Sequence, residues 1–139
     1  MAELEDIARA AVDIGLGIHR ELGPGLLESV YEALLHAHLT SRGFAVERQK
    51  PMPIEVAGLR LKEGFRADLL VEGKLILEVK SVEQLMPVHG RQLLTYLRLA
   101  RLPLGLLMNF GGATFRGNVR RIVNDHRQVP PIEPALRHG

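Results

Sequence analysis

The chain has 139 residues, of which 46% are hydrophobic and 24% are charged, and its formal net charge is +2. This composition can fill a hydrophobic core, so it argues against a disordered chain, and the length predicts one domain over residues 1–139. The absence of cysteine excludes disulfides, thiolate zinc sites and a cysteine nucleophile. Any metal would have to be held by carboxylate, carbonyl, imidazole or water ligands.

The first six residues carry acidic side chains and do not resemble a signal peptide. The chain contains no run of eighteen apolar residues, so we expect no membrane span and no membrane partner. These features predict a cytoplasmic protein. The small positive charge is compatible with nucleic-acid binding but does not by itself indicate it.

Two helices are expected before any strand. Apolar residues recur at helical spacing from Leu4 to about Arg20, and the Gly23-Pro24-Gly25 segment then breaks the chain. A second helix follows and ends at Gly43. We expect the inward stripe of this helix to consist of Leu27, Val30, Leu34 and His38.

The apolar period changes from helical spacing to two at Phe44, which predicts a strand. Pro51 and Pro53 place this strand at a sheet edge, because proline cannot donate a ladder hydrogen bond. Two further short runs flank a tight turn at Ala57-Gly58. The next two runs are joined by the turn Glu72-Gly73 and predict a hairpin of strands Phe65–Val71 and Leu75–Val79.

The last third of the chain predicts one helix and two strands. Pro87 begins a helix that runs to about Arg101, with Leu93, Leu94, Leu97 and Ala100 facing inward. Residues 104–110 form a short apolar run typical of a buried strand, residues 115–123 are expected to form the last strand, and residues 124–139 an irregular tail. This order predicts an α/β fold, a mixed central β-sheet flanked by helices, with two leading helices.

Two acids and a lysine are expected to lie together at the end of the predicted hairpin. Glu78 and Lys80 share one face of their strand, about 6–7 Å apart, while Val79 points into the core. The turn before this strand would bring Asp68 beside Glu78. Such a group can hold a hard divalent cation and a water molecule, and the lysine can act on that water or on a phosphate.

The residues alone leave a second interpretation open. Glu78 and Lys80 would also fit an ordinary ion pair on a solvated face of the sheet. Asp68 favours a site, because an acid within an apolar strand needs a partner or a ligand. A similar choice applies to Glu28 and Tyr31, which are neighbours on one helix face and would also fit a solvated acid and a tyrosine at the core edge.

Several motifs in order resemble the GxxExxY family of the PD-(D/E)XK nuclease superfamily. Residues 25–31 match the GxxExxY signature itself, and residues 19–25 resemble the lead-in to it. Residues 65–71 and 77–81 are similar to the two core strands of the superfamily. Residues 87–97 resemble its following helix, and residues 104–111 its next strand. The likeness extends over about residues 7–123, and it departs from the superfamily name at Ala67, where proline is implied.

The resemblance implies a restriction-endonuclease-like core and assigns roles to named residues. Asp68, Glu78 and the backbone carbonyl of Val79 would be ligands of Mg²⁺ or Mn²⁺, and Lys80 the catalytic lysine. Glu28 would be an additional acid at the metal. The polar stripe on the third helix would face the phosphate, so the expected substrate-binding residues are His89, Gln92, Tyr96 and Tyr31.

The leading hypothesis is a metal-dependent nuclease that hydrolyses phosphodiester bonds, with DNA favoured over RNA as its partner. The alternative is a non-catalytic regulatory module that keeps the nuclease fold and binds nucleic acid or protein. A purely structural subunit is a third possibility. A homodimer is expected, because a domain of this size has limited surface with which to surround a duplex.

Overall fold

The computed structural model describes residues 3–125, so most of the expected irregular tail (residues 126–139) lies outside it. In the described part, five strands form one sheet in the order β1-β2-β3-β4-β5. None of the helices there combines the length and hydropathy that a membrane crossing requires. The elements in chain order are α1 (Leu4–Leu22), α2 (Glu28–Ser41), β1 (Val46–Val56), β2 (Leu59–Val71), β3 (Leu75–Lys80), α3 (Pro87–Ala100), β4 (Leu104–Asn109), a short 3-10 turn (Arg116–Asn118) and β5 (Val119–Val123).

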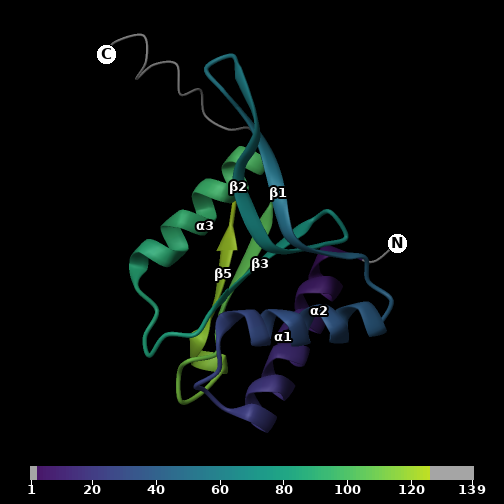
Figure 1. Ribbon diagram of the computed structural model, residues 1–139, viewed down its shortest axis with the longest axis vertical. Helices are drawn as coiled ribbons and strands as arrows, with labels where there is room; N and C mark the ends of the chain where they lie inside the picture. The colour runs from purple at the N-terminus through teal and green to yellow at the C-terminus, as the bar shows by residue number, and fades with distance from the viewer. Residues whose placement is uncertain (1–2, 126–139) are drawn as a thin grey trace.

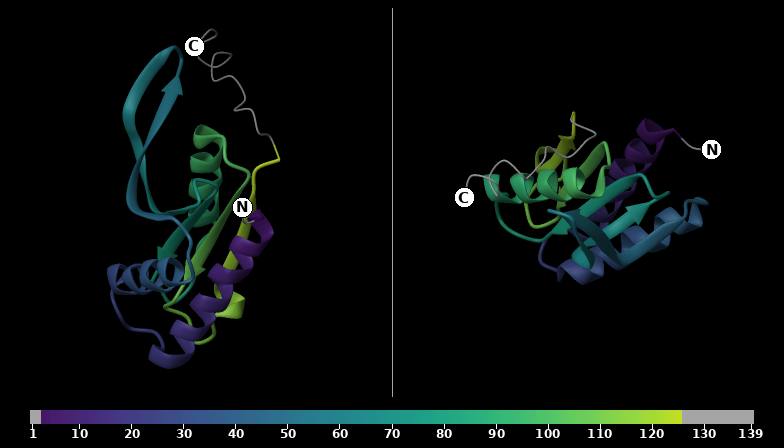
Figure 2. Two further views of the ribbon diagram at one scale, coloured as in Figure 1. Left: turned by 90° about the vertical axis from the view of Figure 1, so that its right-hand side faces the viewer. Right: turned by 90° about the horizontal axis from the view of Figure 1, so that it is seen from above.

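The sheet separates two hydrophobic layers, each formed by buried side chains of the sheet and of the helices. Figure 2 shows how the helices are arranged around the sheet. On one face α1 and α2 pack on Leu77, Val79 and Met108, and on the other face α3 packs on Ile76 and Leu107. The side chains of β3 alternate between these layers, because successive residues of a strand point to opposite faces. All six residues of β4 are buried, so this strand lies at the centre of the fold.

Strands β1 and β2 form one long antiparallel hairpin that extends beyond the helices (Figure 1). The predicted edge position of β1 is confirmed, since within residues 3–125 β1 pairs with β2 alone. The two short runs predicted around Ala57-Gly58 belong to this hairpin, and β2 therefore begins at Leu59 instead of Phe65. The pairing register shifts between Met52 and Ile54, next to Pro53.

Strands β3 and β4 are parallel neighbours, and α3 connects them across one face of the sheet. The predicted final strand began too early: Phe115 is buried before the 3-10 turn, and β5 starts at Val119. Asn124 was expected in a loosely docked tail, yet it is buried, and its side-chain amide donates to the backbone oxygens of Leu97 (3.4 Å) and Leu102 (3.1 Å).

The inward face of α2 differs from the prediction. Leu27 lies before the helix with 73% of its surface exposed, and Val30 is 38% exposed. The buried stripe is instead Tyr31, Leu35 and Leu39, at i, i+4 and i+8. Both stripes are apolar, so periodicity alone could not choose between them. This rotation also turns the acid next to Tyr31, Glu32, toward the sheet.

Two glycines of α1 provide a test of the core packing. A Cβ atom at Gly15 would lie 2.5 Å from Phe115 Cζ and 2.7 Å from Met108 Cε, whereas nothing lies within 4 Å of one at Gly17. We expect Gly17→Ala to stabilise the protein by up to about 1 kcal/mol through helix propensity, and Gly15→Ala to destabilise it by about 1–3 kcal/mol through overpacking. Denaturant unfolding of both variants measures this; equal stabilisation would contradict the close packing of α1 on β4.

Candidate functional site

The centre of the site is a pair of crossed hydrogen bonds between β2 and β3. The two strands pair as far as Leu69 and Leu77. Beyond that point the backbone N–H of Asp68 donates to Glu78 Oε2 (2.8 Å), and the backbone N–H of Val79 donates to Asp68 Oδ2 (2.8 Å). Each carboxylate therefore takes the place of a backbone carbonyl of its own strand and accepts a hydrogen bond from the opposite strand. The expected proximity of Asp68 and Glu78 is confirmed.

Both carboxyl groups have pKa values above their ordinary range. Burial, followed by the charge of Asp68, raises the pKa of Glu78 to about 8, although the hydrogen bond from Asp68 N and the charge of Lys80 oppose this shift. Burial is also the largest cause that raises the pKa of Asp68, and the charge of Glu32 adds to it. Glu78 is buried and Asp68 is half-buried, so the two neighbouring carboxylates resist simultaneous ionisation, and a cation between them would be favoured.

Lys80 is half-buried on the same strand face as Glu78, and its positive charge lowers the pKa of both Asp68 and Glu78. Among residues 3–125 it forms no ion pair within 4.0 Å with either acid, so it acts on them at longer range. Val79 is buried in the layer beneath α1 and α2, as the alternation predicts.

Glu28 is the first residue of α2, and its side chain reaches the end of β3. There its Oε2 atom accepts a hydrogen bond from the backbone N–H of Ser81 (3.3 Å). The Ser81 hydroxyl donates to the carbonyl of Leu26 (2.8 Å), so the start of α2 is tied to the residue that follows Lys80. Within residues 3–125 no three His, Asp or Glu side chains gather as a metal shell. The expected role of Glu28 as an additional acid at the metal therefore stays a prediction.

Sequence reasoning missed a polar network behind Asp68. Glu32 of α2 is 5% exposed and accepts hydrogen bonds from Arg48 Nε (2.9 Å) and Gln49 Nε2 (2.6 Å). Gln49 Nε2 also donates to Asp68 Oδ1 (3.2 Å). The signal was present: Glu32 follows Glu28 by four residues, which places both acids on one side of α2. It was overlooked because the wrong stripe of α2 was taken as buried.

Asn109, at the end of β4, was also missed. It is fully buried, and its side chain binds both the N–H (3.0 Å) and the carbonyl (2.8 Å) of Val82. Its Oδ1 atom also accepts from Gly111 N (3.0 Å), and a Cβ atom at Gly111 would lie 2.3 Å from the Val82 carbonyl. This packing fixes the chain just after Lys80.

The polar stripe of α3 consists of His89, Gln92 and Tyr96, and of these residues Tyr96 is influenced by the charges of the site acids. Tyr96 is half-buried and stacks on Phe65 with ring centroids 4.1 Å apart. Burial, and then the charges of Glu78 and Asp68, raise the pKa of its hydroxyl, so Tyr96 lies within electrostatic range of both acids. Gln92 is exposed. His89 accepts a hydrogen bond from Met86 N at Nδ1 (3.0 Å), which commits that ring nitrogen to the start of α3.

Tyr31 does not fit the expected role in substrate binding, because its side chain is fully buried. Its ring stacks on Phe110 with centroids 4.5 Å apart, and its hydroxyl donates to the carbonyl of Gly23 (2.6 Å). The backbone N–H of Leu26 donates to the same hydroxyl (3.2 Å). Tyr31 thus anchors the loop between α1 and α2, which in turn holds Ser81.

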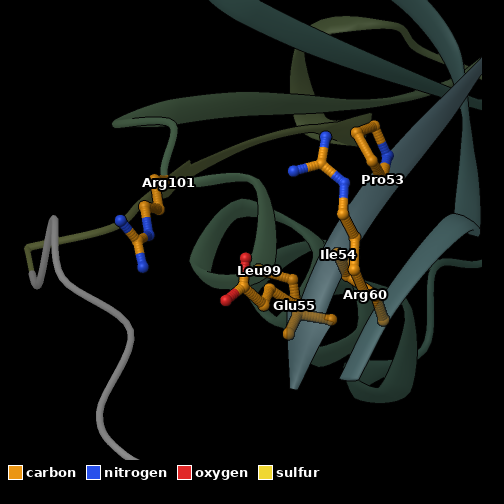
Figure 3. Close-up of a pocket in the computed structure, with 6 residues that line it drawn as sticks. All are labelled: Pro53, Ile54, Glu55, Arg60, Leu99 and Arg101. Atoms are coloured by element: carbon orange, nitrogen blue, oxygen red, sulfur yellow. The ribbon is translucent and has the colours of Figure 1, made fainter. Parts of the chain in front are cut away.

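A hollow of about 200 Å³ lies away from these acids, between the β1–β2 hairpin and the C-terminal end of α3 (Figure 3). Arg60 and Arg101 belong to its opposite walls, and Glu55 lies between them. The hollow has mixed charge and contains none of the expected site residues.

The raised pKa of Glu78 predicts how stability depends on pH. An acid whose folded-state pKa lies above its unfolded value keeps extra protons in the folded state, so stability is greatest below about pH 4.5 for this group and declines as pH rises toward about 8. Glu78→Gln should remove most of this decline and raise stability above pH 8 by on the order of a few kcal/mol. The measurement is denaturant unfolding in chelator from pH 4 to 9, with the exposed Glu55→Gln as control. An unchanged slope in Glu78→Gln would contradict the buried, repelling pair.

Among the comparisons with known proteins, the match to a family model identifies the superfamily of this chain. A solved structure described as "Crystal structure of SSO0001" is similar with a TM-score of 0.47 and 23% sequence identity, over 94% of this chain and 65% of that one, a likeness that carries no argument about function. No curated protein matches the chain. A family model described as the PD-(D/E)XK nuclease superfamily matches residues 5–122, which run from the first turn of α1 into β5. The chain therefore belongs to the PD-(D/E)XK nuclease superfamily, and its mixed sheet with flanking helices is a restriction-endonuclease-like fold.

Proposed function

We propose that the protein is a divalent-metal-dependent nuclease that hydrolyses phosphodiester bonds in nucleic acid, with DNA preferred to RNA. The observation that carries this proposal is the crossed pair of hydrogen bonds, which holds Asp68 and Glu78 together beside Lys80. The motifs of α2 and of the strands also support assignment to the GxxExxY group within the superfamily.

The donor set fits a hard cation. Asp68 and Glu78 supply carboxylate oxygens, and burial and mutual repulsion raise both of their pKa values, a cost that a dication would relieve. We assign Asp68, Glu78 and the Val79 carbonyl as ligands of Mg²⁺ or Mn²⁺, with water filling the remaining positions. When bound, the cation supplies charge neutralisation at the phosphate and a more acidic water. Nucleases of this superfamily generally use divalent metals.

The other residues act around that pair. Lys80 carries a positive charge on the same strand face, where it can orient or deprotonate the attacking water and stabilise charge on the phosphate. Glu28 holds the backbone at Ser81 and so fixes the strand end that carries Lys80. Gln92, Tyr96 and His89 are proposed to contact the substrate from α3, and the charges of Glu78 and Asp68 reach the hydroxyl of Tyr96.

The alternative function is a binding module that keeps the fold without catalysis. It is favoured if the protein binds nucleic acid and Mg²⁺ but cleaves no labelled single- or double-stranded DNA or RNA above the level of an Asp68→Ala control. A second copy of the chain as partner is part of either proposal. Light scattering that gives a mass near 15.4 kDa would reject the homodimer.

Substitutions of Lys80 and Asp68 test the mechanism. Lys80→Ala should lower the cleavage rate by roughly 100-fold or more and leave Mn²⁺ affinity equal or slightly tighter, because it removes a charge that repels the ion. Lys80→Arg should also fail, since a guanidinium stays protonated and differs in shape from an ammonium. Asp68→Ala should lose Mn²⁺ first and cleavage as a consequence.

The measurements are cleavage rate, calorimetric Mn²⁺ affinity and melting temperature on the same four proteins. Melting temperature separates lost chemistry from lost folding, which matters most for Asp68→Ala because it leaves the Val79 amide without its acceptor. If Lys80→Ala cleaves as fast as the wild type, the lysine is only a surface charge and the mechanism is wrong.

A further inference from the structure

Gln49 has a backbone conformation that its sequence position does not explain. Its φ angle is 49°, in the left-handed region that residues other than glycine rarely adopt, and it lies within β1. Neighbouring pairs Arg48–Leu69 and Lys50–Ala67 keep one register, which puts Gln49 directly across from Asp68. Strained backbone of this kind persists only where surrounding contacts hold it.

The strained backbone has a visible result in the side chains. In a regular strand, Arg48 and Gln49 would point to opposite faces. Here both side chains reach the same buried acid, Glu32, at 2.9 and 2.6 Å. The left-handed turn at Gln49 therefore allows two consecutive residues of the edge strand to face α2.

Gln49 uses one nitrogen atom to bridge two acids. Its Nε2 donates to Glu32 Oε1 at 2.6 Å and to Asp68 Oδ1 at 3.2 Å. The opposite oxygen of Asp68, Oδ2, accepts from Val79 N. Both oxygens of Asp68 thus have a donor, so the plane of the carboxylate is fixed from two sides. Arg48 balances part of the charge of Glu32 through an ion pair to its Oε2 atom, and it makes no contact with Asp68.

We propose that Gln49 is a positioning residue, anchored on the buried acid Glu32, that presets the orientation of the Asp68 carboxylate for a divalent cation. The cation-binding part of this inference rests on the proposed function, whereas the orientation of Asp68 does not. Residues that orient a ligand in this way typically contribute 10- to 100-fold to metal affinity. The contact lies where the site meets solvent, because Gln49 is exposed.

The informative variant is Gln49→Gly, which removes the side chain but accepts the left-handed backbone. Arg48→Met is the matched control, because it breaks a bond to the same Glu32 without touching Asp68. In metal-free protein, amide hydrogen exchange by NMR reports on the Val79 N–H, whose acceptor is Asp68. The Phe110 N–H, bonded to the Lys80 carbonyl at 2.8 Å, is an internal reference at the same end of the sheet.

We expect Gln49→Gly to reduce the protection of the Val79 amide by about tenfold relative to that of Phe110 and to weaken Mn²⁺ binding by roughly tenfold. Arg48→Met should lower the melting temperature and leave Mn²⁺ affinity within about threefold of the wild type. Unchanged protection of Val79 in Gln49→Gly would overturn the inference. If the wild type itself binds no Mn²⁺, the proposed function fails, and the Val79 amide still decides whether Gln49 orients Asp68.

Discussion

The exchange of hydrogen bonds between Asp68 and Glu78 is the constraint on which the rest of the site depends. Beyond Leu69 and Leu77 the backbones of β2 and β3 no longer pair, and the two side chains take over as acceptors for the opposite strand. The same atoms thus complete the sheet and concentrate negative charge. The carboxylates cannot separate to relieve their repulsion without leaving buried amide groups unsatisfied. The sheet therefore holds the acids in a strained electrostatic state that a cation would relax.

Contacts from the neighbouring elements hold the groups around the two acids in place. Gln49 and the Glu32–Arg48 pair brace Asp68 from β1 and α2, and Lys80 offsets part of the charge from β3 itself. On the far side Asn109 fixes the backbone at Val82, so the strand end that carries Lys80 has little freedom. Each of these contacts comes from a different element, so the site exists only once the sheet and α2 have assembled.

Sequence reasoning recovered the α/β class, the order of the elements and the proximity of Asp68 to Glu78, because these follow from local periodicity and one tight turn. It missed the inward face of α2, where two apolar stripes compete and only tertiary packing decides between them. It also missed Gln49, since a left-handed residue inside a strand leaves no mark in a pattern of period two. Glu32 and Asn109 were overlooked for a related reason: each is polar but buried, and its partner lies many residues away in sequence.

The edges of the sheet bear on how the protein meets other chains. The outer edge of β1 carries two prolines and several charged side chains, and β5, at the opposite edge, has only five residues and includes Arg120 and Arg121. Prolines, charges and short length all discourage a foreign strand from adding to an open edge. The sheet is thus closed to extension at both sides, even though its backbone groups there have no neighbouring strand among residues 3–125. These features direct contacts with a second chain toward the helices and loops instead of the sheet edges.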